Sequence, residues 1–303
     1  MGGDYSMSNP IGRARVCLDG LSIGDAFGEM FFDRRRVTEN WIEERQLPPS
    51  PWRYTDDSMM AMSVFSILQE YGEINQDALI QSFCENYNPR RGYGSGMHEA
   101  LPRIANGEDW EKVASSLFGG EGSYGNGASM RVAPVGAYFA TDLDLVAENA
   151  AKSAQVTHAH SEATAGAIAV ATGAALAYQS RGEEAPNVHD FIENVLEAVP
   201  DSLTRKAILE ALSVNPEAPV REVVSRIGNG SKITTFDTVP FVLWSAGLHL
   251  DDYNEALWYT VSGLGDIDTT SAMVGGIVAS RVGKEGIPEE WLHKREPLPE
   301  LPL

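Results

Sequence analysis

Apolar side chains recur every three or four residues along most of this chain, as on one face of an α-helix. Within 57–71, for example, Met60, Val64 and Leu68 follow this spacing. Strict alternation of polar and apolar residues, the pattern of a half-buried strand, is scarce. We therefore predict an all-α protein. The helices are expected at 11–31, 57–71, 109–117, 142–154, 161–179, 188–198, 202–213, 218–227, 240–249, 253–262 and 269–282.

Two of the expected helical segments, 161–179 and 271–282, are rich in alanine and glycine. Glycine in a helix interior is less favourable than alanine by up to about 1 kcal/mol, so several together indicate that backbones approach closely in a central bundle. No long linker or sharp change of composition divides the chain. We expect one domain over 1–303, with a core at about 11–283 and a tail, 284–303, that forms a short helix at most.

Composition narrows the class of protein. With 303 residues, 43% of them hydrophobic, the chain can bury a large core. A formal net charge of -20 argues against a general nucleic-acid binder and against attachment to an anionic membrane surface. The two cysteines, Cys17 and Cys84, form neither a disulfide framework nor a cysteine zinc pattern. No secretory signal or membrane-spanning run stands out, and we expect a cytoplasmic protein.

Two short acidic clusters lie more than 200 residues apart, at 55–58 (TDDS) and 266–270 (DIDTT). Each places carboxylates and hydroxyls at the start of a predicted helix. Helix capping accounts for one such residue per helix, but neighbouring carboxylates repel each other unless something neutralises them. Hard divalent cations such as Mg2+ prefer oxygen ligands of this kind. If folding joins the clusters, they form a two-metal site suited to hydrolysis.

Two glycine-rich segments, 91–96 (RGYGSG) and 119–127 (GGEGSYGNG), offer a different chemistry. Glycines let backbone N–H groups approach an anion, so the two segments predict a cradle for a pyrophosphate or nucleotide, with Tyr124 able to stack on a base. Neither fits the P-loop or dinucleotide-fold pattern. A helix is expected to begin near Ala128, with Arg131 in its first turn. Arginines in this half of the chain are candidates to hold an anionic substrate: Arg34, Arg35, Arg36, Arg53, Arg90, Arg91, Arg103 and Arg131.

Four further polar residues lie next to these motifs. His158 and His160 have a poor spacing for a zinc pair, and His158 suits either a substrate hydrogen bond or a structural role. Asp25 lies inside an apolar helical run and needs a buried hydrogen-bond partner, so we assign it a structural role. Glu29 follows one turn later and could face the site.

These segments, in this order, resemble the ADP-ribosylglycohydrolase family. Its members include the dinitrogenase reductase-activating glycohydrolase and the hydrolases that remove ADP-ribose from arginine or serine. Any one of the motifs is moderately specific, whereas five in order along nearly the whole chain form a strong match. The matching stretches are 20–28 (GLSIGDAFG), 54–59 (YTDDSM), 125–134 (GNGASMRVAP), 156–160 (VTHAH) and 263–270 (GLGDIDTT).

The resemblance implies an all-α fold with a central cleft that holds two Mg2+ or Mn2+ ions. The loop at 122–126 would bind the diphosphate and adenosine, and the segment 94–96 would lie near the phosphates and distal ribose. Asp268 would bridge the two ions. The implied metal ligands are Thr55, Asp56, Asp57, Asp266, Asp268 and Thr269. The implied substrate-binding residues are Gly94, Ser95, Gly96, Gly122, Ser123, Tyr124, Gly125, Asn126 and His158.

One departure from the family pattern concerns the catalytic acid or base. Many members have a glutamate seven residues after the aspartate of the G-D-A motif, where this chain has Phe32. Glu29 and Asp33 flank that position, and either could replace it. We therefore name Asp57 and Glu29 as candidate catalytic residues and leave the leaving-group preference open.

The expected activity is metal-dependent hydrolysis at the anomeric carbon of ADP-ribose on a modified protein, with ADP-ribose as product. Arginine-linked ADP-ribose is the first candidate substrate, and serine-linked ADP-ribose and O-acetyl-ADP-ribose are alternatives. The acidic pairs also suit a two-metal nucleotide pyrophosphatase or phosphoesterase. A non-catalytic binding or structural role is the remaining alternative, and a monomer is expected.

Overall fold

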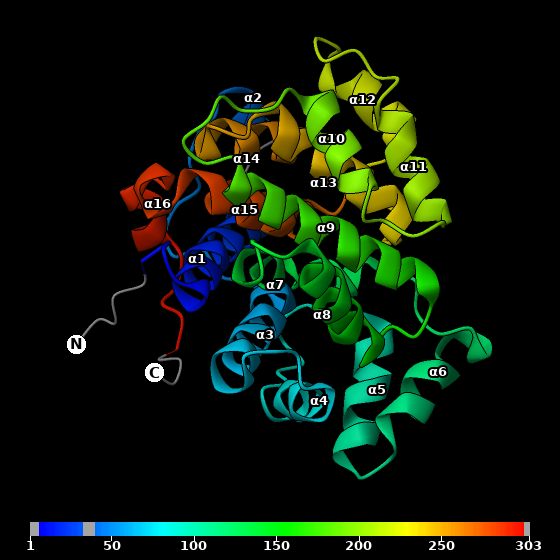
Figure 1. The fold of residues 1–303 in the computed structure, drawn as a ribbon. Coiled ribbons are helices and arrows are strands. Elements are labelled where there is room, and N and C mark those ends of the chain that lie inside the picture. Colours follow the sequence, from blue (N-terminus) through cyan, green and yellow to red (C-terminus); the bar gives the residue numbers. More distant parts are fainter. Residues whose placement is uncertain (1–5, 33–39, 300–303) are drawn as a thin grey trace.

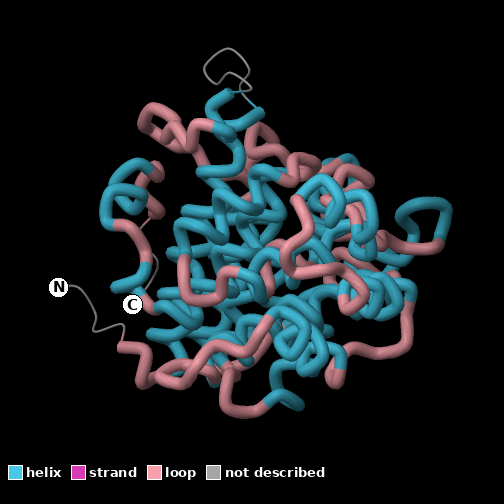
Figure 2. The backbone as a smooth tube through the Cα atoms, turned by 90° about the horizontal axis from the view of Figure 1, so that it is seen from above, coloured by secondary structure: helices cyan, strands magenta, loops and turns pink. Residues whose placement is uncertain are grey.

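The computed structural model describes residues 6–32 and 40–299, and every regular element in these two ranges is a helix. The all-α prediction is therefore confirmed, and Figure 2 shows helices joined by loops throughout. Asp33 and the arginines at 34–36 lie outside the described residues. The α-helices are α1 Pro10–Glu29, α2 Asn40–Glu43, α3 Asp56–Tyr71, α4 Gln76–Glu85, α5 Ser95–Ala105, α6 Trp110–Gly120, α7 Ala133–Tyr138, α8 Leu143–Gln155, α9 Ser161–Gln179, α10 Val188–Leu196, α11 Leu203–Ala211, α12 Val220–Ile227, α13 Thr235–Leu248, α14 Tyr253–Ser262, α15 Ile267–Val282 and α16 Glu289–Lys294. Three 3-10 turns accompany them, η1 Met30–Phe32, η2 Asn126–Ala128 and η3 Lys284–Gly286.

Periodicity located most long helices correctly and missed several short ones. The bounds of α9 and α14 agree with the predicted ranges, whereas α4, α5 and α7 were not predicted. The helix expected near Ala128 is wrong, because only the 3-10 turn η2 forms there and α7 begins at Ala133. Pro134 in the first turn of α7 explains the later start, since proline favours that position in a helix.

The most extensive pair among the described helices is α1 with α15, which lie next to each other left of the centre in Figure 1. Gly20, Gly24 and Gly28 recur every four residues and form one stripe of α1 that faces α15. A methyl group at Gly24 would collide with the carbonyl oxygen of Ser271, and one at Gly28 would lie 2.6 Å from that of Ile267. The two backbones are therefore in direct contact, as the glycine content predicted for a central bundle.

The other central helices surround this pair. Helices α3, α7, α9, α13 and α14 all pack against α1 or α15, and α9 and α13 are almost wholly buried. The tail forms the short helix α16, as expected, but its Trp291 is only 1% exposed and stacks on Phe27 with ring centroids 4.6 Å apart. The tail is thus part of the core and closes one end of α1.

A carboxylate fixes the join between α9 and α11. Glu162, in the first turn of α9, accepts hydrogen bonds from the backbone N–H groups of Leu203 and Thr204 at 2.7 and 2.8 Å and from the Thr204 hydroxyl. It therefore satisfies the amides that open α11. Burial alone would raise the pKa of Glu162, but these hydrogen bonds outweigh it and hold the pKa below its ordinary value.

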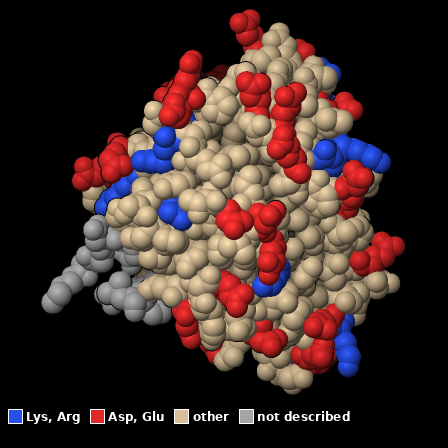
Figure 3. Space-filling model, viewed as in Figure 1, with Lys and Arg blue, Asp and Glu red and all other residues tan. Residues whose placement is uncertain are grey.

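The surface matches the strongly acidic composition. Figure 3 shows Asp and Glu side chains spread over this face of the molecule, with fewer Lys and Arg between them. In the described ranges, no helix has both the length and the apolar character needed to cross a bilayer.

We predict that Gly24→Ala lowers the free energy of unfolding by about 3 kcal/mol, because the added methyl forces α1 away from α15. Urea unfolding followed by circular dichroism measures this change. The matched control is Gly173→Ala in α9, where the new methyl meets only the ends of side chains, the nearest being Leu243 Cδ2 at 3.1 Å. This control should stay within about 1 kcal/mol of wild type. Equal effects of the two substitutions would contradict the backbone contact.

We also predict a pH-dependent contribution from Glu162. Because its pKa is lowered on folding, its stabilisation is present above the ordinary glutamate pKa and is lost as the pH falls through the folded value. Between about pH 6 and pH 3, wild type should therefore lose more stability than Glu162→Gln. Thermal unfolding of both proteins across this range tests the prediction, and parallel curves would contradict it.

Candidate functional site

Two helix N-termini meet at the site, and both carry an acidic cluster. Helix α3 begins at Asp56 after Thr55, and α15 begins at Ile267 after Asp266. These are the positions that helix capping predicts, yet neither Thr55 nor Asp266 makes a side-chain capping bond. Capping therefore does not account for these polar residues, whereas both helix dipoles favour negative charge at this point.

Asp25 in α1 holds the start of α3. Its carboxylate accepts hydrogen bonds from the backbone N–H and the hydroxyl of both Thr55 and Ser58, and it is fully buried. The buried hydrogen-bond partners that Asp25 was expected to need are thus present. Thr55 Oγ1 lies 2.8 Å from Asp25 and 2.9 Å from Asp57 Oδ2, but its single proton can serve only one of these carboxylates.

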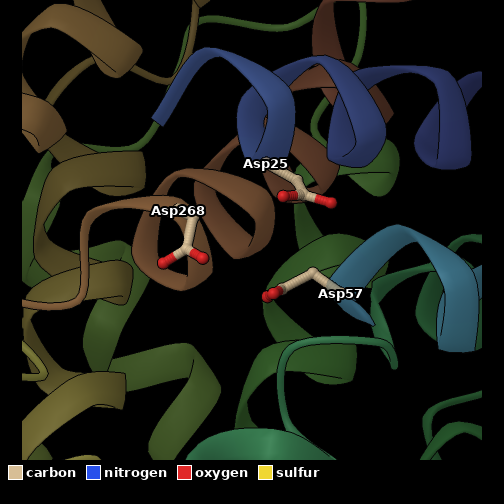
Figure 4. Close-up of side chains that lie close together, drawn as sticks. All are labelled: Asp25, Asp57 and Asp268. Atoms are coloured by element: carbon tan, nitrogen blue, oxygen red, sulfur yellow. The ribbon is translucent and has the colours of Figure 1, made fainter. Parts of the chain in front are cut away.

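Three carboxylates from three helices converge beside these hydroxyls. Figure 4 shows Asp25 from α1, Asp57 from α3 and Asp268 from α15, with oxygen atoms that all lie within 4.8 Å of one another. Thr269 Oγ1 reaches Asp57 Oδ2 at 3.5 Å, so the fold joins the two acidic clusters. Asp25 was not expected as a member of this group.

The converging carboxylates have no counter-charge within the described ranges, where no Lys or Arg forms an ion pair with any of them. Asp57 Oδ1 is buried without a hydrogen-bond partner. Burial, followed by the charge of Asp25, raises the pKa of Asp57 well above its ordinary value and that of Asp56 to about 8. Burial and Asp266 similarly raise the pKa of Asp268.

This donor set fits a hard divalent cation. All the converging ligands are carboxylate or hydroxyl oxygens, which Mg2+ and Mn2+ prefer, and a cation would neutralise the buried charge and give Asp57 Oδ1 a partner. Asp25, Asp57 and Asp268 could therefore hold a metal ion. Helix packing and side-chain hydrogen bonds aim these carboxylates at one point, which is the requirement for such a site.

Asp266 is held by a residue expected to bind substrate. The side-chain amide of Asn126 donates to Asp266 Oδ2 at 2.7 Å and to Thr238 Oγ1 at 3.1 Å, and Asn126 is only 3% exposed. It therefore connects the glycine-rich loop to the start of α15. On the other side, the backbone N–H of Asp56 donates to Arg91 O at 2.7 Å, which ties the segment 91–96 to α3.

A cavity of about 430 Å³ opens beside the carboxylates. Most of the residues predicted to bind substrate line it. Gly122 does not, because it packs behind the wall, where a methyl group would lie 3.0 Å from His160 N. The predicted site residues in the wall are Asp56, Gly94, Ser95, Gly96, Ser123, Tyr124, Gly125, Asn126, His158, Asp266, Asp268 and Thr269.

Sequence reasoning missed several residues of the cavity wall. Phe118, Lys232 and Ile233 all line the cavity, and Phe118 and Ile233 are 57% and 62% exposed. Both also have left-handed backbone, with φ of 51° and 57°, a conformation that is costly for bulky side chains. The glycine content of the neighbouring loops was the available signal for irregular backbone here, but it does not identify which side chains face the cavity.

The two histidines have separate roles. His158 is buried in the cavity wall, and burial together with the charge of Arg131 lowers its pKa to about 3, so the ring is neutral. His160 Nδ1 accepts from the backbone N–H of Glu162 at 3.1 Å and caps α9. The prediction that they do not form a zinc pair agrees with these different partners.

None of the described arginines that were candidates to hold an anionic substrate lines the cavity. Arg131 is fully buried, Arg91 pairs with Glu296, and Arg103 pairs with Glu108. Each of these guanidinium groups is already used within the fold. Among the described residues, Lys232 is the cationic side chain in the cavity wall, and its Nζ lies 3.6 Å from Asp237 Oδ1.

Glu29 is the last residue of α1, close to the carboxylate group. After burial and the nearer aspartates, its charge also contributes to the raised pKa of Asp56 and Asp268. Phe32, at the position where many family members have glutamate, ends η1 and is 46% exposed.

An all-α protein with buried carboxylates at the floor of a cavity, and glycine-rich loops in its wall, has the arrangement expected of a metal-assisted hydrolase. A sequence profile of the ADP-ribosylglycohydrolase family matches residues 6–302. The chain belongs to this family and is an enzyme of the glycohydrolase class, as the sequence motifs predicted.

Individual relatives agree with this assignment. The chain is 30% identical to ADP-ribosylhydrolase ARH3 of Homo sapiens over 324 residues, which cover 93% of this chain and 88% of the human protein. It is 31% identical to an uncharacterized protein of Archaeoglobus fulgidus over 95% of this chain and 94% of that protein. The solved structure of an ADP-ribosylglycohydrolase-related protein complex superposes with a TM-score of 0.67 at 23% identity, covering 95% and 94% of the two chains, and supports the fold.

We predict that the protein binds Mg2+ through the carboxylate group and that Asp268→Asn weakens this binding by about 100-fold or more. Isothermal titration calorimetry measures the affinity, and Mg2+ should also raise the melting temperature of wild type. Asp201→Asn is the matched control, because Asp201 is fully exposed and remote in the chain from both acidic clusters. Equal Mg2+ affinity in the two variants would contradict the site.

Proposed function

We propose that this enzyme hydrolyses the bond between the anomeric carbon of ADP-ribose and a protein side chain. The observation that carries the proposal is the group of converging carboxylates, which form no ion pair with a described Lys or Arg, beside a cavity walled by the segments 94–96 and 123–127. A carboxylate centre suits the oxocarbenium-like transition state of glycoside hydrolysis, in which positive charge develops on the ribose.

The proposed cofactor is a pair of Mg2+ or Mn2+ ions. Thr55, Asp56 and Asp57 would hold the ions from the start of α3, and Asp266, Asp268 and Thr269 from the start of α15. Thr55 Oγ1 can donate its proton to Asp25 and keep a lone pair for a metal. A metal ion would then also bind Asp57, which this proton does not reach. Divalent ions in such a site orient substrate hydroxyls and make a water molecule more acidic.

The cavity wall offers contacts for the diphosphate and the adenine base of ADP-ribose. We assign the diphosphate to the backbone of the two glycine-rich segments and to Lys232, the cationic side chain beside them. Tyr124 and Phe118 both line the cavity and are 38% and 57% exposed, so each offers an aromatic face for the adenine base.

Two carboxylates are candidates for proton transfer. Asp57 is 1% exposed and is surrounded by Thr55, Thr269 and the other aspartates, which suits a metal ligand. Glu29 is less buried and lies at the end of α1, where a water molecule can reach it. We therefore propose Glu29 as the group that takes the proton from the attacking water, replacing the glutamate absent at Phe32.

The defining experiment measures release of ADP-ribose from an arginine-ADP-ribosylated protein, with Mg2+ or with EDTA. Release should require Mg2+ and should fall by about 100-fold or more in Asp268→Asn. Metal-free protein with full activity would refute the mechanism. AMP as the product would instead identify a pyrophosphatase.

The same assay with serine-linked ADP-ribose and O-acetyl-ADP-ribose decides the linkage. Arginine-linked substrate is the first to test, and the highest kcat/KM among the three identifies the preferred leaving group.

We further predict that Glu29→Gln lowers kcat by about 100-fold while ADP-ribose still binds with near wild-type affinity, because only proton transfer is removed. Glu193→Gln, at an exposed position of α10, is the control. An unchanged kcat in Glu29→Gln would transfer the role to Asp57.

A further inference from the structure

A line of hydrogen bonds runs from the protein core to the cavity wall. Arg131, in the turn between η2 and α7, is fully buried and donates through Nη2 to Ser153 O at 2.6 Å and to Thr157 Oγ1 at 2.9 Å. Thr157 Oγ1 in turn lies 2.8 Å from Nδ1 of His158, which lines the cavity. Ser153 lies in the last turn of α8, so the first of these contacts serves that helix end, whereas the contact with Thr157 leads on toward the cavity.

The side chains of Arg131, Thr157 and His158 differ in what they can donate and accept, and this sets the donor and acceptor of each hydrogen bond. A guanidinium group can only donate, so Thr157 Oγ1 must accept from Arg131. The Thr157 hydroxyl then has one proton to donate, and within the described ranges its other partner is His158 Nδ1. Since Thr157 is fully buried, a proton without an acceptor would be unfavourable. Nδ1 therefore accepts, and the single proton of the neutral ring lies on Nε2.

The guanidinium group of Arg131 stays charged although it is buried. Burial lowers the pKa of Arg131 to about 9, which is still above neutral pH, and the Phe83 ring lies 4.6 Å from the guanidinium carbon. No carboxylate forms an ion pair with Arg131 within the described ranges, and its Nε has no hydrogen-bond partner. A buried, unpaired cation of this kind needs a role beyond packing.

Two glycines keep the other ring nitrogen accessible. A methyl group at Gly127 would lie 3.1 Å from His158 Nε2, and one at Gly125 would lie 3.7 Å away. Any larger residue at these positions would cover Nε2. Both glycines line the same cavity as His158, so the protonated nitrogen faces the space assigned to the substrate.

We infer that Arg131 and Thr157 are positioning residues that fix His158 as the Nε2–H tautomer, so that it presents a neutral hydrogen-bond donor to an oxygen of the bound ligand. The other tautomer would present a lone pair, which repels phosphate oxygens because these can only accept hydrogen bonds. The tautomer follows from the hydrogen bonds alone, whereas the identity of the ligand rests on the proposed function.

The test is the side-chain nitrogen spectrum of the full-length protein without ligand, by long-range proton–nitrogen NMR. His158 signals are assigned by their loss in His158→Asn. Wild type should show a protonated Nε2 and an unprotonated Nδ1. Thr157→Val removes the hydroxyl with little change of shape and should raise the Nδ1–H population, while Thr157→Ser should restore the wild-type spectrum.

Binding of ADP-ribose to the same proteins supplies the second measurement. Its affinity should fall about tenfold in Thr157→Val and recover in Thr157→Ser, with melting temperatures that show both variants folded. A wild-type spectrum with protonated Nδ1, or a Thr157→Val variant with unchanged spectrum and affinity, would overturn the inference. If wild type has the expected tautomer but binds no ADP-ribose, the proposed function fails and the tautomer assignment stands.

Discussion

The close approach of α1 and α15 is the constraint on which the site depends. Asp25 follows Gly24 of the glycine stripe in α1, and Asp268 lies in the first turn of α15, so the distance between the two helices sets the distance between their carboxylates. Side chains larger than glycine at positions 20, 24 and 28 would separate the backbones. The same packing that stabilises the core therefore also forms the carboxylate centre.

This arrangement places like charges where the fold alone disfavours them. Carboxylates within 4.8 Å of each other repel strongly here, because Asp25 and Asp57 are buried, Asp268 is partly buried, and little water is present to screen them. Hydrogen bonds from Thr55 and Ser58 satisfy Asp25, but Asp57 Oδ1 remains without a partner. A divalent cation removes the repulsion, and the cluster is consequently better explained as a binding site than as part of the core.

Two cationic side chains, Arg131 and Lys232, occupy different positions relative to the cavity. Arg131 lies behind the wall and donates to Thr157, which in turn contacts His158. Among the described residues, Lys232 is the cation in the wall itself, in the loop between α12 and α13. Two of the candidate arginines, Arg91 and Arg103, form ion pairs within the fold instead of lining the cavity, which residue type and sequence position do not reveal.

The sequence by itself determined the helical class, most of the long helices and the family, because helical periodicity and short motifs are local properties of the chain. It also identified both acidic clusters and the loops around Gly94 and Gly125. Only the tertiary structure decided that Asp25 joins the carboxylates, that Asn126 holds Asp266, and which side chains face the cavity. These facts depend on contacts between segments that are distant in the sequence, such as those of Asn126 and Asp266, and no local pattern encodes the direction in which a side chain points after packing.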